Sequence, residues 1–282
     1  MQDASKPIWF NTPKVQSKDF DYTKIKLLVC TPVHSVLSIH YVESILKLQQ
    51  SAILYGMGFS CMLLKSSLIT QGRNLSVSNF LSAPENYTHL LFIDSDISFE
   101  TDSLFKMLKY DKEIISIPYP LKTLDWDKIT NRINKENIRD MDTISKSGYM
   151  YPIKVEDKEN VTVNNGIIKV THSPTGFMLI KRQVFDKMIK AYPNLKISQP
   201  LILNGVETER ENMWNFFDTW FDEKNNKYYG EDFAFCQKWT DIGGECYCYI
   251  NDYITHVGEY LYTGRFYDEL RNITKIDESN KN

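Results

Sequence analysis

The chain lacks several features that would place it in a familiar class. None of its apolar runs reaches the roughly 20 residues that a transmembrane helix needs, and its N-terminus has no charged-then-apolar export pattern. Basic residues are not in excess, because 33 Lys and Arg stand against 36 Asp and Glu, which argues against general attraction to nucleic acid. The five cysteines, an odd number in 282 residues, do not resemble a secreted disulfide framework. We therefore expect a cytoplasmic protein with no membrane span and no nucleic-acid partner.

Apolar runs and amphipathic segments alternate through the first half of the chain. This alternation predicts an α/β fold with a mostly parallel, Rossmann-like central sheet flanked by helices. Ligands bind beyond the carboxyl ends of the strands in such sheets. The helix over residues 35–55 is expected to bury Ile39, Val42, Ile45, Leu46 and Ile53. The other expected elements are strands at Ile25–Cys30 (ending at Thr31-Pro32), Phe59–Leu64, Leu90–Ile93 and Ile114–Ile117, and helices at Asn74–Leu81 and Thr101–Tyr110.

The second half is less regular but contains clear local signals. We expect one domain over residues 24–270, an N-terminal extension over 1–23, a C-terminal tail over 271–282, and variable loops at 121–170 and 193–212. The first loop contains Asn164-Asn165-Gly166, which predicts a hairpin turn and a small antiparallel region. Further expected elements are a strand at Gly176–Ile180, a helix at Arg182–Tyr192, a hairpin around Glu223–Asn226, a helix at Glu231–Asp241 and a strand at Cys246–Ile250.

Two carboxylates follow the most apolar of the expected strands. Leu90–Ile93 reads as a strand buried on both faces, and Asp94 and Asp96 come directly after it. Residues two apart in an extended chain project to the same side, so the two carboxylates can converge on one cation. The alternative is a turn at the strand end, in which Asp96 caps the following helix.

Three later features carry side chains that are common in catalytic sites. Glu231 and Asp232 begin a helix, where they either act on a substrate or merely complement the helix dipole. His256 follows the last strand and, taken alone, has no assigned role. Arg73 opens the helix after the second strand and either faces a nucleotide or lies on the surface.

In this order the chain resembles the GT-A class of nucleotide-sugar-dependent glycosyltransferases, and it is most similar to soluble bacterial and large-virus or phage members with an Asp-x-Asp motif. The resemblance spans nearly the whole expected domain, except for 121–170 and 193–212. If the source is viral or phage, the expected compartment is the host cytoplasm. The matching segments are Leu27–Pro32, Gly72–Asn74, Leu91–Asp96, Ile117–Pro120, Thr175–Ile180, Tyr229–Cys236, Trp239–Gly244 and Thr255–Gly258.

The resemblance implies a set of site residues and partners. It implies Mn²⁺ or Mg²⁺ held by Asp96 and His256, with Asp94 either as a third ligand or in contact with the ribose, and a His ligand favours manganese. The implied substrates are a nucleotide-diphosphate sugar and a glycan or other hydroxyl acceptor. Asp232 is the expected catalytic base if the enzyme inverts, with Glu231 binding substrate hydroxyls. The residues implied for the nucleotide are Thr31, Pro32, Arg73, Asp94 and Ser95, and those considered for sugar stacking, or equally for core packing, are Tyr119, Trp126, Trp214 and Trp220.

Other functions are compatible with parts of this pattern. A sugar nucleotidylyltransferase has a similar fold but is expected to carry a Gly-rich basic loop after the first strand, and Thr31–Ser35 has neither property. An Asp-x-Asp phosphatase normally places the pair after its first strand. A catalytically inactive glycan- or nucleotide-binding protein on the same scaffold is the non-enzymatic alternative. The sequence predicts neither the sugar nor the oligomeric state.

Overall fold

The computed structural model describes residues 19–203, 206–258, 261–273 and 277–278. Its centre is a seven-stranded sheet in the order β2-β1-β3-β8-β5-β13-β7. Five of these strands run in one direction, while β8 and β7 run in the opposite direction. The predicted α/β fold with a mainly parallel central sheet is therefore confirmed. The strands are β1 (Lys26–Val33), β2 (Gly58–Lys65), β3 (His89–Ile93), β5 (Ile114–Ser116), β7 (Ile167–Val170), β8 (Phe177–Lys181) and β13 (Cys246–Tyr249).

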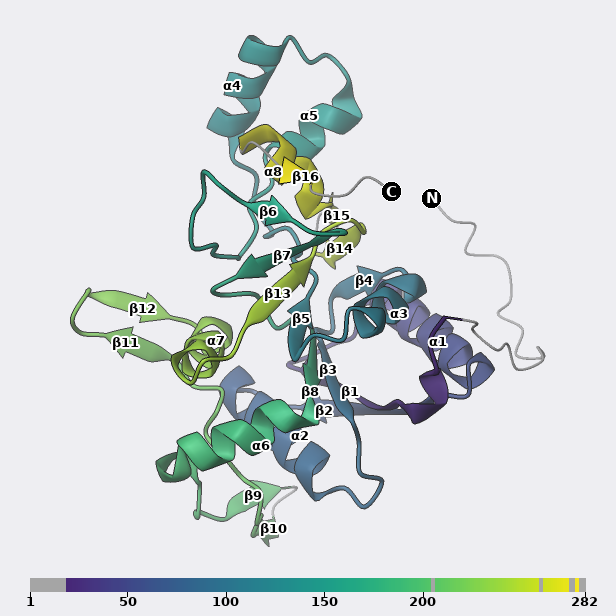
Figure 1. Cartoon of the computed structure of the whole chain (residues 1–282), viewed down its shortest axis with the longest axis vertical. Coiled ribbons are helices and arrows are strands. Elements are labelled where there is room, and N and C mark those ends of the chain that lie inside the picture. The colour runs from purple at the N-terminus through teal and green to yellow at the C-terminus, as the bar shows by residue number, and fades with distance from the viewer. Residues whose placement is uncertain (1–18, 204–205, 259–260, 274–276, 279–282) are drawn as a thin grey trace.

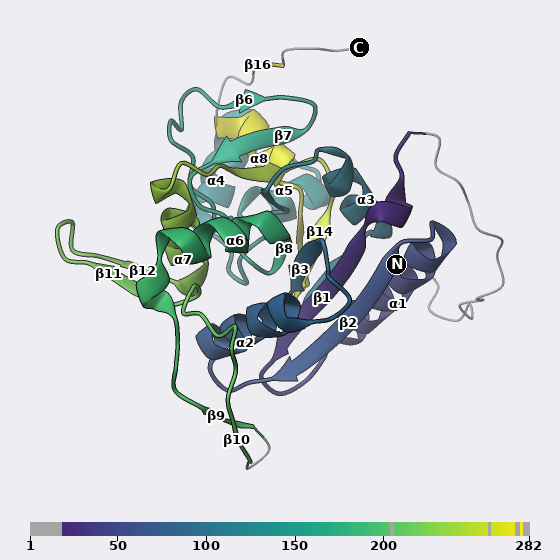
Figure 2. The same cartoon turned by 60° about the horizontal axis from the view of Figure 1, so that its bottom comes forward.

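Helices cover both faces of this sheet (Figure 1). Helices α1 and α3 pack on one face, and α2, α6 and α7 pack on the other, which the rotated view in Figure 2 brings forward. Each face buries its own apolar cluster, so both faces of the sheet are shielded from solvent. This arrangement agrees with strands whose residues are apolar on both faces. These helices are α1 (Ile39–Leu54), α2 (Ile69–Ser82), α3 (Thr101–Lys109), α6 (Arg182–Ala191) and α7 (Glu231–Asp241).

The antiparallel strand β8 lies between β3 and β5. It pairs with β3 along its full length, from Phe177 opposite Ile93 to Lys181 opposite His89. The beginning of β8 therefore lies against the carboxyl end of β3. This pairing brings Gly176 beside the Asp94 backbone, whose N–H donates to the Gly176 carbonyl at 3.0 Å.

Strand β1 continues past the predicted stop at Thr31-Pro32 and ends at Val33. Pro32 pairs with Leu64 of β2, whereas the pairing of β1 with β3 ends at Cys30. Proline is tolerated here because at this point the strand has a neighbour on one side only, as in an edge strand.

The buried face of α1 overlaps only in part with the predicted one. Ile39 and Ile53 are 78% and 58% exposed, whereas Tyr41, Ser44 and Leu48 are buried. The reason is tertiary: the Ser44 hydroxyl accepts the Phe99 backbone N–H, so a polar side chain is satisfied inside the core. Of the five predicted residues, Val42 and Ile45 pack against the core, whereas Ile39, Leu46 and Ile53 are exposed, so the apolar spacing located the buried face only in part.

The segment 121–170 contains more regular structure than predicted. The expected hairpin turn at Asn165-Gly166 is present, and both residues have the positive φ that this turn requires. Two helices, however, occupy the part that was predicted to be irregular. Helix α4 buries only Ile129, and most of its residues are polar or charged, so its few apolar residues were not interpreted as a helix. The elements here are α4 (Trp126–Glu136), α5 (Met141–Ser147) and β6 (Thr162–Val163).

The remaining elements lie around the sheet. Strands β4 (Ile97–Phe99), β14 (Ile254–Val257) and β15 (Leu261–Gly264) form a small antiparallel sheet, and β11 (Trp220–Asp222) and β12 (Lys227–Tyr229) form a projecting hairpin (Figure 1). The second predicted loop contains η2 (Pro193–Leu195), β9 (Leu201–Leu203) and β10 (Val206–Thr208); its residues 204–205 lie outside the described part. The last described elements are α8 (Phe266–Ile273) and β16 (Asp277–Glu278), which pairs with β6.

The two predicted terminal segments are described only in part. Residues 1–18 of the N-terminal extension lie outside the described residues, and η1 (Tyr22–Lys24) spans the predicted boundary. In the tail, helix α8 continues to Ile273, while 274–276 and 279–282 lie outside the described residues. In the part of the chain that the structure describes, no helix combines the length and apolarity that crossing a bilayer demands.

Candidate functional site

Asp94 and Asp96 lie in the tight connection between β3 and β4. Both are half-buried, and backbone hydrogen bonds fix the connection, because the Ile97 N–H donates to the Asp94 carbonyl and the Val257 N–H to the Asp96 carbonyl. The chain turns between the two residues instead of remaining extended. Their carboxylates therefore face different cationic partners, unlike the convergence that strand periodicity predicted.

Asp96 meets His256 and Lys122. Its Oδ2 lies 3.4 Å from His256 Nε2 and also accepts a hydrogen bond from the Lys122 ammonium group. Burial opposes ionisation of Asp96, but these hydrogen bonds and charges outweigh it and hold its pKa below the usual value. The structure thus brings together two residues that are 160 positions apart in sequence and that the resemblance assigned to one metal.

The ring orientation of His256 suits a metal ligand. Its Nδ1 lies 2.9 Å from the Pro120 carbonyl oxygen, to which it can only donate, so Nε2 carries the lone pair of the neutral ring. A carboxylate oxygen and a lone-pair nitrogen on the same side are a donor pair that manganese accepts. Among the described residues, no group of three or more His, Cys, Asp or Glu side chains is placed to hold a metal by itself. A cation here would need further oxygen ligands from substrate or water.

Arg73 forms a buried bridge between the two acidic motifs. It is 2% exposed, and it donates from Nη2 to Asp94 Oδ1 at 2.9 Å and from Nε to Glu231 Oε1 at 3.0 Å. Burial alone would lower its pKa, but the two carboxylates raise it above the usual value. Its Nη1 is also buried and has no hydrogen-bond partner among the described residues. Because α2 starts at Ile69, Arg73 lies inside the helix and not at its opening as predicted.

Asp232 is the carboxylate with the most unusual environment. It lies in the first turn of α7, where its Oδ1 accepts the Phe233 backbone N–H at 2.7 Å. Burial, followed by the negative charge of Glu231, raises the pKa of Asp232 to about 6. Glu231 is held by Arg73, whereas Asp232 forms no ion pair among the described residues. The two neighbouring acids therefore have different chemical capacities.

Tyr119 lies at the centre of these groups. It is 9% exposed, and its ring contacts His256 edge-on at 4.9 Å. Burial, and then the charges of Asp94 and Asp232, raise its pKa well above the usual value. Gly176 makes this packing possible, because a Cβ there would lie 2.6 Å from the Tyr119 ring and 2.7 Å from Asp94 Oδ2.

Two residues of this site received no role from the sequence. Lys122 follows β5, at the same edge of the sheet as the other groups, and that position was the available signal. Gly176 belonged to a matching segment but was interpreted only as part of a strand. Its importance depends on the antiparallel pairing of β8, which the sequence pattern does not reveal.

The other residues expected to bind the nucleotide lie near this edge of the sheet and differ in how deeply they are buried. Thr31 is fully buried, and its hydroxyl pairs with Tyr41 Oη at 2.7 Å. Pro32 is also buried, within β1. Ser95 is half-buried, and its carbonyl accepts the Ser38 N–H at the start of α1.

The aromatic candidates separate into buried and exposed residues. Trp214 stacks on Phe216 and is 8% exposed, so it belongs to the core. Trp126 is 68% exposed at the start of α4. Trp220 is 40% exposed, and its ring stacks on that of Tyr229 with centroids 5.2 Å apart. Tyr229 lies two residues before Glu231, the first residue of α7.

Comparisons with known proteins add little beyond this geometry. No family model and no curated protein matches the chain. The crystal structure of A197 from STIV aligns with 92% of this chain and 98% of its own, at 14% identity and a TM-score of 0.45. The crystal structure of a glycosyltransferase involved in the glycosylation of the major capsid of PBCV-1 aligns with 60% of this chain and 66% of its own, at 10% identity and a TM-score of 0.26. Neither similarity is strong enough to assign an activity.

Proposed function

We propose that this chain is a metal-dependent glycosyltransferase that moves a sugar from a nucleotide-diphosphate sugar to a glycan or other hydroxyl acceptor. One observation carries the proposal. Residues from β3, α2, α7 and β14 meet at one edge of the sheet, where Arg73 joins Asp94 to Glu231 and Tyr119 lies between His256 and the Asp94 carboxylate. Nucleotide ligands bind at this edge in open α/β sheets.

The site offers two chemically distinct halves. In one half, Asp96 and His256 supply a donor pair for Mn²⁺ or Mg²⁺. The cation, when bound, would supply positive charge for the diphosphate of the donor. Lys122 can add a second positive charge to the same phosphates, because its ammonium group already lies at Asp96. This half therefore suits a leaving group that gains negative charge.

The other half offers a base. A carboxylate with a pKa of about 6 is ionised at neutral pH and still basic enough to accept a proton from an attacking hydroxyl. In an inverting reaction, Asp232 takes that proton as the acceptor oxygen attacks the sugar carbon. Glu231, fixed by Arg73, positions donor or acceptor hydroxyls. Trp220 and Tyr229 form an adjacent aromatic surface on which a sugar ring can stack.

Nucleotide binding and donor hydrolysis together test the proposal. We expect calorimetry with UDP, GDP and CDP to show binding of at least one nucleotide that requires Mn²⁺, and that nucleotide's sugars to be hydrolysed or transferred. Asp96→Ala should abolish the metal-dependent binding, whereas the exposed control Asp127→Ala should retain it. Metal-dependent binding with neither hydrolysis nor transfer across a donor panel would instead support the inactive glycan-binding alternative. Absence of any metal-dependent nucleotide binding would exclude the proposal.

A further inference from the structure

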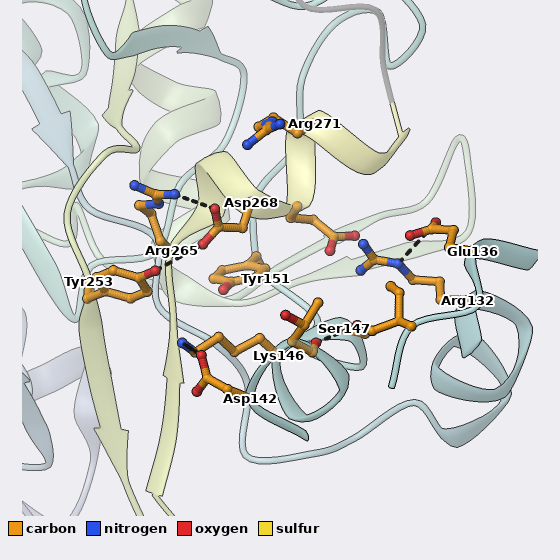
Figure 3. Close-up of a pocket in the computed structure, with 13 residues that line it drawn as sticks. Arg132, Glu136, Asp142, Lys146, Ser147, Tyr151, Tyr253, Arg265, Asp268 and Arg271 are labelled. Atoms are coloured by element: carbon orange, nitrogen blue, oxygen red, sulfur yellow. Dashed lines mark hydrogen bonds and ion pairs between the residues drawn. The ribbon is translucent and has the colours of Figure 1, made fainter. Parts of the chain in front are cut away.

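A cavity lies away from the proposed transfer site, between α4, α5 and α8 (Figure 3). Its volume is about 380 Å³, within the range of small-molecule sites. No residue that lines it belongs to the set described above around Arg73, Tyr119 and Asp96. The proposed transfer reaction therefore gives this cavity no role.

The walls of the cavity are closely packed. Lys128 of α4 forms an ion pair with Glu269 of α8, and the Tyr151 ring packs edge-on against Phe266 at 5.1 Å. The Tyr151 hydroxyl lies close against Gly264, where a Cβ would be only 1.9 Å from Tyr151 Oη, so this position requires glycine. The elements that form the cavity are thus held together by charge and packing, which preorganises the space between them.

Arginine side chains from separate elements surround the cavity. Arg132 comes from α4, Arg265 from the junction of β15 and α8, and Arg271 from α8, as Figure 3 shows. The Nε atoms of Arg132 and Arg265 are buried and have no hydrogen-bond partner among the described residues. Arg132 and Arg265 form ion pairs with Glu136 and Asp268, while Arg271 has none among the described residues. The four cations at the cavity, Lys146 and these three arginines, thus face four carboxylates. The guanidinium donors left without an acceptor among the described residues are the two buried Nε atoms and those of Arg271.

The same wall also contains groups that suit hydroxyls. Asp268 forms an ion pair with Arg265 and accepts the Tyr253 hydroxyl at 3.4 Å. Asp142 forms an ion pair with Lys146, and a carboxylate has about four acceptor positions. The Tyr253 hydroxyl also lies at the cavity. A bare anion would be repelled by these carboxylates, as would an extended polyanion. A ligand with one acidic group and several hydroxyls can pair its acidic group with the arginines and its hydroxyls with the carboxylates.

We propose that this cavity binds an acidic sugar, whose carboxylate or phosphate group is held by the arginines and whose hydroxyls are held by the carboxylates. An anion pairs with planar guanidinium groups through two parallel hydrogen bonds, which gives direction as well as charge. This binding does not depend on whether the chain transfers a sugar, because the two sites share no residue.

Calorimetry on the full chain with four matched probes tests this assignment. Glucuronic acid and glucose 6-phosphate carry the acidic group on the same ring, glucose lacks it, and inorganic phosphate lacks the ring. We expect at least one acidic sugar to bind, and to bind at least about tenfold more tightly than either glucose or phosphate, the usual scale for a hydrogen bond to a charged group. The preferred acidic sugar distinguishes carboxylate from phosphate recognition. Excess UDP with Mn²⁺ should not displace it.

Charge-removing variants locate the binding. Arg271→Ala and Arg132→Ala should each weaken binding of the acidic sugar about tenfold or more. Arg139→Ala removes the same charge from an exposed position that does not line the cavity, and it should bind like wild type. Circular dichroism tests whether each variant is folded. If one arginine variant unfolds, the other still tests the proposal. Absence of binding by both acidic sugars, binding of phosphate or glucose as tight as that of the acidic sugars, or wild-type affinity in both arginine variants would overturn the proposal.

Discussion

Replacing Asp232 with Asn is expected to stabilise the fold at neutral pH and to slow catalysis. The pKa of Asp232 is raised from 3.8 to about 6, chiefly by burial and then by Glu231. A carboxyl with a raised pKa stabilises the fold in its protonated form. That contribution is complete below about pH 4 and is lost as the pH rises through about 6. Above that pH the folded chain holds an ionised group in an unfavourable place, and the neutral amide of Asn removes the penalty.

The expected size follows from the shift itself. About two pKa units correspond to about 3 kcal/mol at pH 8, and to about half of that at pH 5, where the wild-type group is still largely protonated. The Asn oxygen can still accept the Phe233 N–H, so this hydrogen bond is retained. Turnover should fall by a factor on the order of 10² to 10⁴, the usual result of removing a general base. For the wild type, kcat/KM should rise with pH through about 6.

Urea unfolding at pH 5 and pH 8, beside donor turnover, measures both effects. Asp186→Asn makes the same change at an exposed position of α6 and should show neither the pH-dependent stabilisation nor the loss of turnover. A stability gain of Asp232→Asn over the wild type that is absent, or that does not grow from pH 5 to pH 8, would refute the burial argument. Unchanged turnover would show that another group accepts the proton.

Three further changes test the rest of the site. Arg73→Met leaves two carboxylates without their cation and should lower the free energy of unfolding by about 3–5 kcal/mol, as measured by urea unfolding. Lys122→Ala removes the ammonium group that competes for Asp96, so Mn²⁺ should bind several-fold more tightly in the absence of nucleotide, as measured by electron paramagnetic resonance. Gly176→Ala forces a methyl group against the Tyr119 ring and should cost about 1–3 kcal/mol, with a matching fall in nucleotide affinity.

Each of these changes has a matched control. Arg139→Met and Lys135→Ala alter exposed side chains and should leave stability and Mn²⁺ affinity at wild-type values. Gly58→Ala meets its nearest neighbour at 3.3 Å, so it should cost less than the change at Gly176. A stable Arg73→Met protein would mean that the bridge contributes little. Weaker Mn²⁺ binding by Lys122→Ala would indicate that the lysine assists the metal.

Local sequence patterns predicted the regular elements that have strong local signals. The apolar run before Asp94 gave a buried strand, and the periodicity after Gly230 gave α7 with its observed bounds. The Asn165-Gly166 turn was also predictable, because its backbone angles favour those two residues. In contrast, α4 and α5 were missed, since they contain few apolar residues and bury little of their surface.

The sequence by itself determined the α/β alternation, the apolar strands and the identity of the acidic and imidazole groups, because these depend on residue type and short-range spacing. Only the tertiary structure decided how those groups pair. The antiparallel insertion of β8 placed Gly176 against Asp94, and long-range folding brought Arg73 to Asp94 and Lys122 to Asp96. Spacing along one strand cannot report which cation a carboxylate meets, since the partner comes from a distant segment whose position is set by packing of the whole sheet.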